Sequence, residues 1–302
     1  MMKIRFTVLV AATAIFFLIL YACNGNKNKE TILTGTTSVL IDETLLPIIE
    51  DQVAVFENQY AAKIKLIPQS EKEAVVSLTK NTSGVIVLSR KLNKEETAIF
   101  KKKKIVPRET PFAIDAIALI KNKKSKDSLV DLSDIVNFLK GNRTKIKGLV
   151  FDNPNSSTVR YFSEVAGIQS IPEKDVFSFK TNDEVIKYVA ENDGMIGVVG
   201  LNWLFQPKKE MRQYVDNISV LSVKDAHSKE YIYPSQENIG TRTYPLARVL
   251  YIINCQGYDG LGMGFSSFVA GEIGQRIILK SGIAPMREPS RNIRIRKKNE
   301  NN

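Results

Sequence analysis

The residues best suited to chemistry form a hydroxyl-rich turn, Asn153-Pro154-Asn155-Ser156-Ser157-Thr158-Val159-Arg160-Tyr161. The turn joins a short apolar run to an amphipathic segment, so its three adjacent hydroxyls lie at the expected start of a helix. Backbone amides at a helix start have no partner inside the helix and favour negative charge, and Arg160 adds a planar, bidentate donor. This pattern indicates an oxyanion site. Simple helix capping by Asn155 or Ser156 explains the same residues equally well.

Two further polar groups follow apolar runs. Ser89 and Arg90 come directly after the run Gly84–Leu88, and Asp42-Glu43-Thr44 lies between a predicted strand and its helix. Asp42 is also explained as the N-cap of that helix, with Glu43 in the favoured acidic first turn. The sequence contains no Walker loop and no dinucleotide fingerprint, so these groups do not indicate nucleotide binding.

The elements that must position these residues alternate along the chain between apolar strands and amphipathic helices. The predicted strands are 37–41, 63–67, 84–88, 112–120, 148–151, 195–199 and 248–253. The predicted helices are 43–59, 70–80, 93–104, 132–140, 158–166, 181–191 and 261–279. This alternation indicates an α/β sheet with helices on both faces, in which ligands bind beyond the carboxyl ends of the strands.

Two long apolar runs and one local spacing lead to further predictions. The long apolar runs 112–120 and 248–253 suit crossings between two lobes, and such crossings would make the first lobe discontinuous. Ser70 and Glu73 have the spacing of a capping box at the start of a helix.

Histidine and cysteine are scarce, which limits the chemistry that the chain can perform. His227 is the single histidine and lies in a polar stretch typical of a solvated loop. Triad catalysis and metal sites with several histidines are therefore not indicated. Cys255 ends an apolar run and is interpreted as a small buried side chain. We expect no enzyme activity, no cofactor and no metal.

The first thirty residues have the pattern of an export signal. Lys3 and Arg5 precede the uncharged run 7–21, which is shorter than the about 20 residues of a membrane span. The run leads into Leu20-Tyr21-Ala22-Cys23, which resembles the lipobox of bacterial lipoproteins, where the cysteine is diacylated and becomes the new N-terminus. A signal anchor, or an ordinary signal peptide with an incidental cysteine, is the alternative.

The net charge of +11 lies mostly at the two ends of the chain. Residues 1–30 and 291–302 together hold +7 of it, which leaves +4 for residues 31–290. A mildly positive body is typical of an anion-binding protein. The basic tail is expected either to lie on anionic lipid or to stay disordered. Nucleic acid is not an expected partner, because the excess charge lies mainly outside the predicted folded body.

The order of several segments resembles the periplasmic phosphate-binding protein family (PstS-like) of ABC uptake systems. The segments that carry the resemblance are 42–47, 87–92, 111–120, 155–158, 194–200, 244–251, 271–276 and 282–286, and they span residues 32–288. The resemblance implies a two-lobed, type II-like binding-protein fold with mixed sheets, helices on both faces and a discontinuous first lobe. The expected parts are a lipoprotein signal peptide (1–22), a tether (23–30), lobe 1 (31–118 plus 245–290), lobe 2 (119–244) and a basic tail (291–302).

The resemblance also implies ligand-binding residues, although it carries over unevenly. The Ser-Gly-Thr anion turn of the family is similar to Ser156-Ser157-Thr158, with Ser in place of Gly. The two hydroxyl-rich loops of the first lobe are acidic here and keep Thr44 and Ser70. Asp152 stands where the family often has an arginine, for which Arg90 or Arg160 is expected to compensate. The implied ligand-binding residues are Thr44, Ser70, Ser89, Arg90, Ser156, Ser157, Thr158 and Arg160.

Together, these features predict a solute-binding protein of the cell envelope, lipid-anchored to a membrane through Cys23 and facing the periplasm or the outside. Its cleft is expected to bind phosphate or a related oxyanion, to close by hinge bending and to deliver the ligand to ABC permease subunits. The acidic loops favour an alternative, an envelope interaction lipoprotein with the same fold and no small oxyanion ligand. A third hypothesis, an enzyme with paired carboxylates, is weaker because capping and solvation explain the acidic loop residues more simply.

Overall fold

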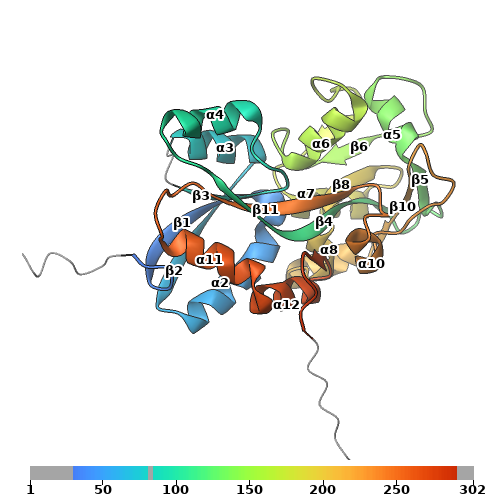
Figure 1. Cartoon of the computed structure of the whole chain (residues 1–302). Helices are drawn as coiled ribbons and strands as arrows, with labels where there is room; N and C mark the ends of the chain where they lie inside the picture. The colour runs from blue at the N-terminus through green and yellow to red at the C-terminus, as the bar shows by residue number, and fades with distance from the viewer. Residues whose placement is uncertain (1–29, 81–83, 291–302) are drawn as a thin grey trace, which may run out of the picture.

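The computed structural model describes residues 30–80 and 84–290, which form two lobes joined by a mixed sheet (Figure 1). Within the described residues the sheet has ten strands, eight of them in the order β2-β1-β3-β11-β4-β8-β6-β7, while β9 and β12 also pair with β4. The strands are β1 (Gly35–Asp42), β2 (Ala62–Gln69), β3 (Val85–Leu88), β4 (Arg108–Asn122), β6 (Leu149–Phe151), β7 (Val176–Ser178), β8 (Ile196–Gly200), β9 (Ile218–Val220), β11 (Ala247–Asn254) and β12 (Ala284–Pro285). A separate small sheet pairs β5 (Leu129–Asp131) with β10 (Ser222–Lys224).

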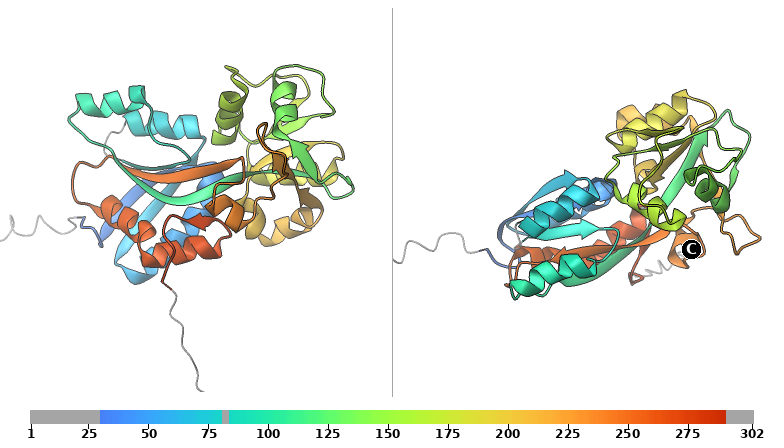
Figure 2. Two further views of the ribbon diagram at one scale, coloured as in Figure 1. Left: turned by 45° about the vertical axis from the view of Figure 1, so that its right-hand side comes forward. Right: turned by 90° about the horizontal axis from the view of Figure 1, so that it is seen from above.

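Helices cover both faces of the sheet in each lobe (Figures 1 and 2). In the first lobe they are η2 (Glu43–Leu45), α2 (Leu46–Gln59), α3 (Glu71–Lys80), α4 (Lys94–Lys102), α11 (Leu261–Ala270) and α12 (Glu272–Lys280). In the second lobe they are α5 (Leu132–Leu139), α6 (Ser157–Ala166), α7 (Asn182–Glu191), α8 (Asn202–Phe205), η3 (Lys209–Met211), α9 (Arg212–Val215) and α10 (Gln236–Gly240). The prediction of a two-lobed α/β binding-protein fold with mixed strands is therefore confirmed.

The strands β4 and β11 connect the two lobes. β4 pairs antiparallel with β11 from Arg108 to Ala116, and then antiparallel with β8 from Ile117 to Ile120. Residues 112–120 of β4 are all buried, because helices cover both faces of the sheet around them. The expected crossing role of these two apolar runs is confirmed, while the exact residues at which the lobes divide stay a prediction.

Each lobe has its own hydrophobic core. In the first lobe, α2, α11 and β1 enclose one cluster, where Phe56 packs edge to face on Phe265 with ring centroids 5.4 Å apart. A second cluster lies under α3 and α4 on the other face of the same sheet. The second lobe has one large cluster built on β4, β6, β8 and α7. Each lobe therefore packs around its own core, and the crossing strands join the two lobes.

The parallel strands of both lobes end where the lobes meet. In the first lobe β1 pairs parallel with β2 and β3, and these strands end at Asp42, Gln69 and Leu88. In the second lobe β6 is parallel to β8, and these strands end at Phe151 and Gly200. The segments that follow four of these ends, those of β1, β2, β3 and β6, supply all eight polar residues predicted for the site.

Two local predictions need correction. The expected continuous helix 261–279 is two helices, because Gly271 is extended (φ −82°, ψ 177°) and separates α11 from α12. The expected capping box at the start of α3 is only half formed. The Glu73 carboxylate accepts from the Ser70 backbone amide at 3.4 Å, but the Ser70 hydroxyl donates to the same carboxylate rather than accepting from the helix.

The remaining local predictions concern the scarce residues and the chain ends. His227 is exposed in a turn and Cys255 is buried, as expected, and burial raises the pKa of the Cys255 thiol to about 12. The predicted signal peptide, the lipobox with Cys23 and the basic tail 291–302 lie outside the described residues. Among the helices that the structure describes, none combines the length and hydropathy needed to cross a bilayer.

Candidate functional site

The predicted site residues gather at the junction of the two lobes. Thr44 lies in η2 after β1, and Ser157 begins α6 after β6. Their hydroxyl oxygens are 3.1 Å apart, so the first lobe and the second lobe are in direct polar contact. The backbone amide of Lys72 also donates across the junction to the carbonyl of Asn155 at 3.2 Å. The described lobes are therefore closed on one another at this point.

A buried carboxylate organises the hydroxyl-rich turn. The hydroxyls of Ser156 and Thr158 donate to Asp152 Oδ1 at 2.5 and 2.6 Å, and Asn182 Nδ2 donates to Oδ2 at 3.1 Å. We call these four residues the Asp152 cluster. Burial raises the pKa of Asp152, while the hydrogen bonds from Ser156 and Thr158 act in the opposite direction. All four residues belong to the second lobe, so the cluster is complete without the first lobe.

The capping alternative for this turn is also confirmed. Ser156 is the N-cap of α6 and accepts from the backbone amide of Val159 at 3.4 Å. The helix ends at Gly167, whose positive φ of 65° is the conformation that favours glycine after a helix. Ser156 therefore caps the helix with one interaction and donates to Asp152 with another.

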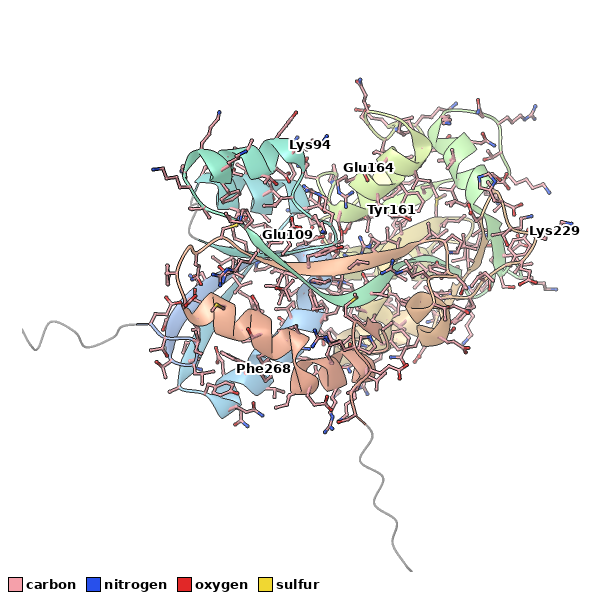
Figure 3. All side chains as sticks on the ribbon, viewed as in Figure 1. Lys94, Glu109, Tyr161, Glu164, Lys229 and Phe268 are labelled. Carbon is pink, nitrogen blue, oxygen red and sulfur yellow. The ribbon has the colours of Figure 1, made fainter. Side chains whose placement is uncertain are left out.

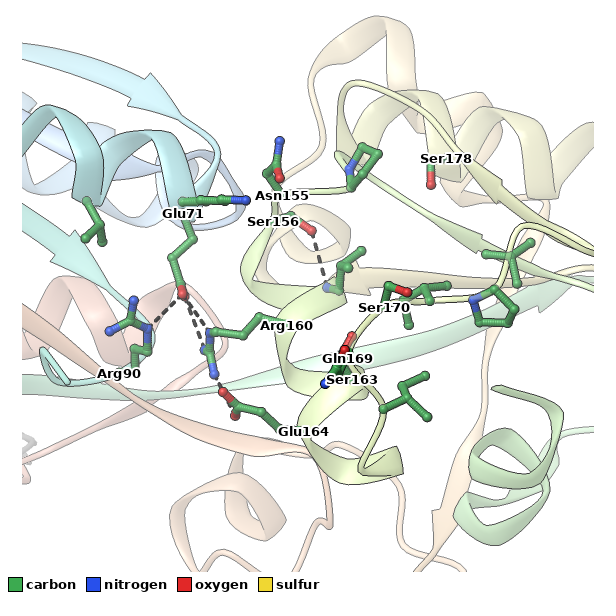
Figure 4. Close-up of a pocket in the computed structure, with 18 of the residues that line it drawn as sticks. Glu71, Arg90, Asn155, Ser156, Arg160, Ser163, Glu164, Gln169, Ser170 and Ser178 are labelled. Carbon is green, nitrogen blue, oxygen red and sulfur yellow. Dashed lines mark hydrogen bonds and ion pairs between the residues drawn. The ribbon is translucent and has the colours of Figure 1, made fainter. Parts of the chain in front are cut away.

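A second carboxylate, Glu71, is held by donors from both lobes (Figure 4). From the first lobe, Arg90 Nε donates to Glu71 Oε1 at 2.8 Å and the Ser89 hydroxyl lies 3.5 Å from Oε2. From the second lobe, Arg160 donates to Oε1 through Nε at 2.6 Å and to Oε2 through Nη2 at 3.2 Å. We call these four residues the Glu71 cluster. The arrangement is that of an anion site whose anion is a side chain of the protein.

Each arginine of the Glu71 cluster also has a carboxylate partner within its own lobe. Arg90 makes two hydrogen bonds of 2.8 Å to Glu96, and Arg160 donates to Glu164 at 2.8 Å. Burial alone would lower the pKa of both arginines, but the surrounding carboxylates outweigh this effect and raise the pKa of each. Both guanidinium groups therefore stay charged and held in place by partners other than Glu71.

Deeper in the junction, Arg248 on β11 links the crossing strands to the hydroxyl turn. Its Nη2 donates to Asp115 Oδ2 on β4 at 2.7 Å, and its Nη1 donates to the Ser157 hydroxyl at 3.1 Å. Both charged residues are almost completely buried, and burial raises the pKa of Asp115 against the lowering effect of Arg248. Arg248 Nε and Asp115 Oδ1 have no hydrogen-bond partner among the described residues. The site thus retains a buried donor and a buried acceptor that its own residues do not use.

Two more acids, Asp42 and Glu43, line the first-lobe side of the junction. Asp42 Oδ1 accepts from the Thr44 amide at 3.2 Å, which confirms that Asp42 is an N-cap, but its buried Oδ2 is unpartnered among the described residues. Burial and the charge of Glu71 raise the pKa of Asp42 to about 7. Burial and the charge of Asp152 likewise raise the pKa of Glu43 to about 7. Both acids therefore change charge near neutral pH.

A groove of about 910 Å³ opens beside the Glu71 cluster. Figure 4 shows Arg160 reaching from α6 toward Glu71 and Arg90 of the first lobe, with Ser178 on the side of the groove away from them. The rest of its lining comes largely from α6 and the segment 168–178, with several apolar side chains. The Glu71 carboxylate thus lies next to open space, although its side chain is only 3% exposed.

Seven of the eight predicted residues take part in this network, and Ser70 does not join them. Its hydroxyl donates to Glu73 at 2.7 Å, so it serves the start of α3. Sequence reasoning missed the central roles of Glu71, Asp152, Asp115 and Arg248. Asp115 and Arg248 carried a readable signal, because Asp115 is the one charged residue in the apolar run 112–120 and Arg248 is the one charged residue of β11. Figure 3 shows many side chains with nitrogen and oxygen ends extending outward from the ribbon, whereas Asp115 and Arg248 are buried.

Within the described residues, no group of three or more histidine, cysteine or acidic side chains has an arrangement that could hold a metal ion. Glu71, Asp115 and Asp152 are instead paired with arginines, hydroxyls and an amide. The chemistry that this site offers is the binding and release of a polar group between two lobes.

Comparison with known proteins agrees with this geometry. The sequence profile described as the PBP superfamily domain matches residues 25–272, most of the chain. The chain belongs to the PBP superfamily. The predicted membership of the PstS-like binding proteins is confirmed at the level of the superfamily and the fold.

Several solved structures share the fold of this PBP-superfamily chain. A putative phosphate ABC transporter substrate-binding protein from Clostridium perfringens, with bound phosphate, superposes with a TM-score of 0.70 at 18% identity, covering 84% of this chain and 100% of that one. An ABC-type phosphate transport receptor from Vibrio cholerae gives a TM-score of 0.62 at 16% identity, covering 83% and 100%. PstS from Borrelia burgdorferi gives 0.52 at 21% identity, covering 84% and 99%. No curated protein sequence matches the chain.

Proposed function

We propose that this chain is an extracytoplasmic solute-binding protein of an ABC-type uptake system, which takes phosphate or a related oxyanion between its lobes. One observation carries the proposal. Arg160 from the second lobe and Arg90 with Ser89 from the first converge on one carboxylate. An oxyanion offers the same acceptor atoms to these donors, and arginine recognises such groups with two parallel hydrogen bonds.

The deeper part of the junction supplies further groups for this ligand. Thr44 and Ser157 provide hydroxyls from opposite lobes, and Arg248 Nε is a buried donor that no described residue uses. Asp42 Oδ2 offers an acceptor for a protonated oxyanion. Rotation at the crossing strands β4 and β11 would open the junction to admit the ligand, and closure would present the loaded form to a permease.

Isothermal titration of the purified protein tests this function with phosphate, sulfate, molybdate and tungstate, each up to millimolar concentration. We expect at least one of them to bind, and Arg160→Ala to weaken that binding by about tenfold or more through loss of a charged donor. Arg276→Ala is the matched control, since this exposed arginine pairs with Glu272 far from the junction. Binding of none of the four anions would contradict the proposal.

The lipid anchor is part of the same proposal and rests on the lipobox pattern at Cys23. Diacylation of this cysteine would hold the protein at the membrane of the cell envelope through residues 24–30. Fractionation of cells that express the wild type and Cys23→Ala tests it. We expect the wild type in the membrane fraction and the variant outside it, with a diacylglyceryl mass increment on the N-terminal peptide of the wild type only.

A second candidate function is an envelope interaction protein with the same fold and no small ligand. The observation in its favour is that carboxylates of the chain already take the main donors, Asp152 in one cluster and Glu71 in the other. A stable protein partner recovered by pull-down, together with no binding in the anion titrations, would favour this function over transport.

A further inference from the structure

We infer that Glu71 is a built-in competitor for the ligand and a latch that closes the empty protein, an inference that rests on the proposed function for its ligand. Its carboxylate accepts three hydrogen bonds of 2.6 to 3.2 Å from Arg90 and Arg160. It occupies the donors that would hold a bound oxyanion. The ligand therefore has to displace Glu71 from Arg160 before it can use the same atoms.

The contacts between Glu71 and Arg160 cross the junction between the lobes. Glu71 is the first residue of α3 in the first lobe, and Arg160 lies in α6 of the second lobe. Arg160 Nη2 also lies 3.4 Å from the Ser89 hydroxyl, and the Lys72 amide bonds to Asn155 beside it. Separation of the lobes breaks all of these contacts together. In a binding protein that closes on its ligand, the ligand makes the contacts that join the lobes. Here the Glu71 side chain makes such contacts.

The two arginines do not need Glu71 to stay in place. Glu96 holds Arg90 from the same lobe, and Glu164 holds Arg160 from the same helix. When Glu71 leaves, each guanidinium therefore keeps a carboxylate partner and its orientation. Donors that are already oriented lose little conformational freedom on binding a ligand.

The local charge around the two arginines depends on Glu71. The two arginines and their three carboxylate partners have a formal sum of −1, and this sum becomes zero without Glu71. An incoming anion is therefore repelled while Glu71 remains in the cluster and meets a neutral cluster once it leaves. The adjacent groove, of about 910 Å³, has room for the displaced side chain.

A tethered competitor lowers the apparent affinity for the ligand in proportion to the fraction of molecules in which the site is free. Removal of its charge should therefore strengthen binding. We expect Glu71→Gln to bind tungstate at least about tenfold more tightly than the wild type. The matched control is Glu173→Gln, which removes an exposed carboxylate that lines the same groove outside the Glu71 cluster, and we expect it to change the affinity by less than about threefold. The titrations use the purified protein and sodium tungstate.

The latch has its own readout, which needs no ligand. Small-angle X-ray scattering of the ligand-free protein should give a larger radius of gyration for Glu71→Ala than for the wild type or Glu173→Gln. Saturating tungstate should return the variant to the wild-type value. Equal radii for all three ligand-free proteins would overturn the latch.

The two measurements separate the inference from the proposed function. If the wild type binds tungstate and Glu71→Gln binds it no more tightly, the competitor role is wrong and the binding function stands. If neither protein binds any of the four oxyanions, the proposed function fails, and the scattering result alone decides the latch. Circular dichroism melts of each variant confirm that a changed affinity or radius does not come from unfolding.

Discussion

The Asp152 cluster and the Glu71 cluster use the same chemistry in two different places. In each, a buried carboxylate of the chain accepts several hydrogen bonds where an oxyanion would be recognised. The donors to Asp152 all belong to the second lobe, whereas the donors to Glu71 come from both lobes. The Asp152 cluster is therefore a fixed part of one lobe, whereas Arg160 joins the Glu71 cluster only while the lobes are closed.

This difference assigns separate physical roles to two acids that look alike in sequence. Loss of Asp152 should destabilise the folded lobe, since its donors are buried and have few other partners. Loss of Glu71 should change the balance between open and closed forms and leave the folded lobes nearly as stable as before. The following predictions test this distinction, beginning with the largest expected effect.

The largest expected effect on stability comes from Arg248, which forms a buried ion pair with Asp115 at the junction. Arg248→Met removes the partner of Asp115 and leaves its carboxylate buried without a countercharge. We expect the free energy of unfolding to fall by about 3–5 kcal/mol, measured by urea denaturation. Addition of Asp115→Asn should recover part of the loss, because the unpaired charge is then gone. Equal losses in the single and double variants would contradict the pairing.

Asp152→Ala removes the acceptor shared by Ser156, Thr158 and Asn182. We expect a loss of about 3 kcal/mol in the free energy of unfolding, since buried donors are left without a strong acceptor. Asp193→Ala, at an exposed position in the same lobe, is the control and should change it by less than about 0.5 kcal/mol. A similar small change for Asp152→Ala would remove the distinction between the two clusters.

Glu71→Ala should cost much less, about 1 kcal/mol or below in the same urea assay. Arg160 is 24% exposed at the junction, so solvent weakens its pairing with Glu71, and each arginine keeps another carboxylate. A loss as large as that of Asp152→Ala would show that Glu71 is part of the stable fold, and would contradict the role of a displaceable latch.

The smallest expected effect is a change in anion affinity with pH. Asp42 and Glu43 have pKa values raised to about 7, so they are mostly protonated at pH 6 and ionised at pH 8. Their negative charges then oppose an anion at the junction, and we expect sulfate to bind about threefold more weakly at pH 8 than at pH 6. Sulfate is a dianion over this whole range, so its own titration does not contribute. Asp42→Asn should reduce the dependence, and affinity that rises with pH would contradict this reasoning.

Much of the fold could be predicted from the sequence because periodicity and local capping depend on neighbouring residues. The strands and helices, and the crossing role of 112–120 and 248–253, follow from such patterns. The break at Gly271 could not be predicted in the same way. Residues on both sides of it have helical periodicity, and only the extended conformation at Gly271 divides α11 from α12.

The hydroxyls of the site and its two arginines Arg90 and Arg160 could also be predicted, because they follow strand ends where ligands usually bind. The partners that occupy them could not. Glu71 lies 89 residues from Arg160, and Asp115 lies 133 from Arg248. These contacts depend on how the chain folds and how the two lobes close. A single sequence does not show that residues so far apart along the chain lie close together in space.

A crystal of the wild-type protein soaked in sodium tungstate tests the central claim most directly, because the anomalous signal of tungsten locates the anion without ambiguity. We predict one strong peak at the junction, with tungstate oxygens bonded to Arg160, Arg90 and Ser89, and the Glu71 carboxylate moved away from Arg160. A junction without a tungsten peak, in which Glu71 still accepts the hydrogen bonds of Arg160, would contradict the account.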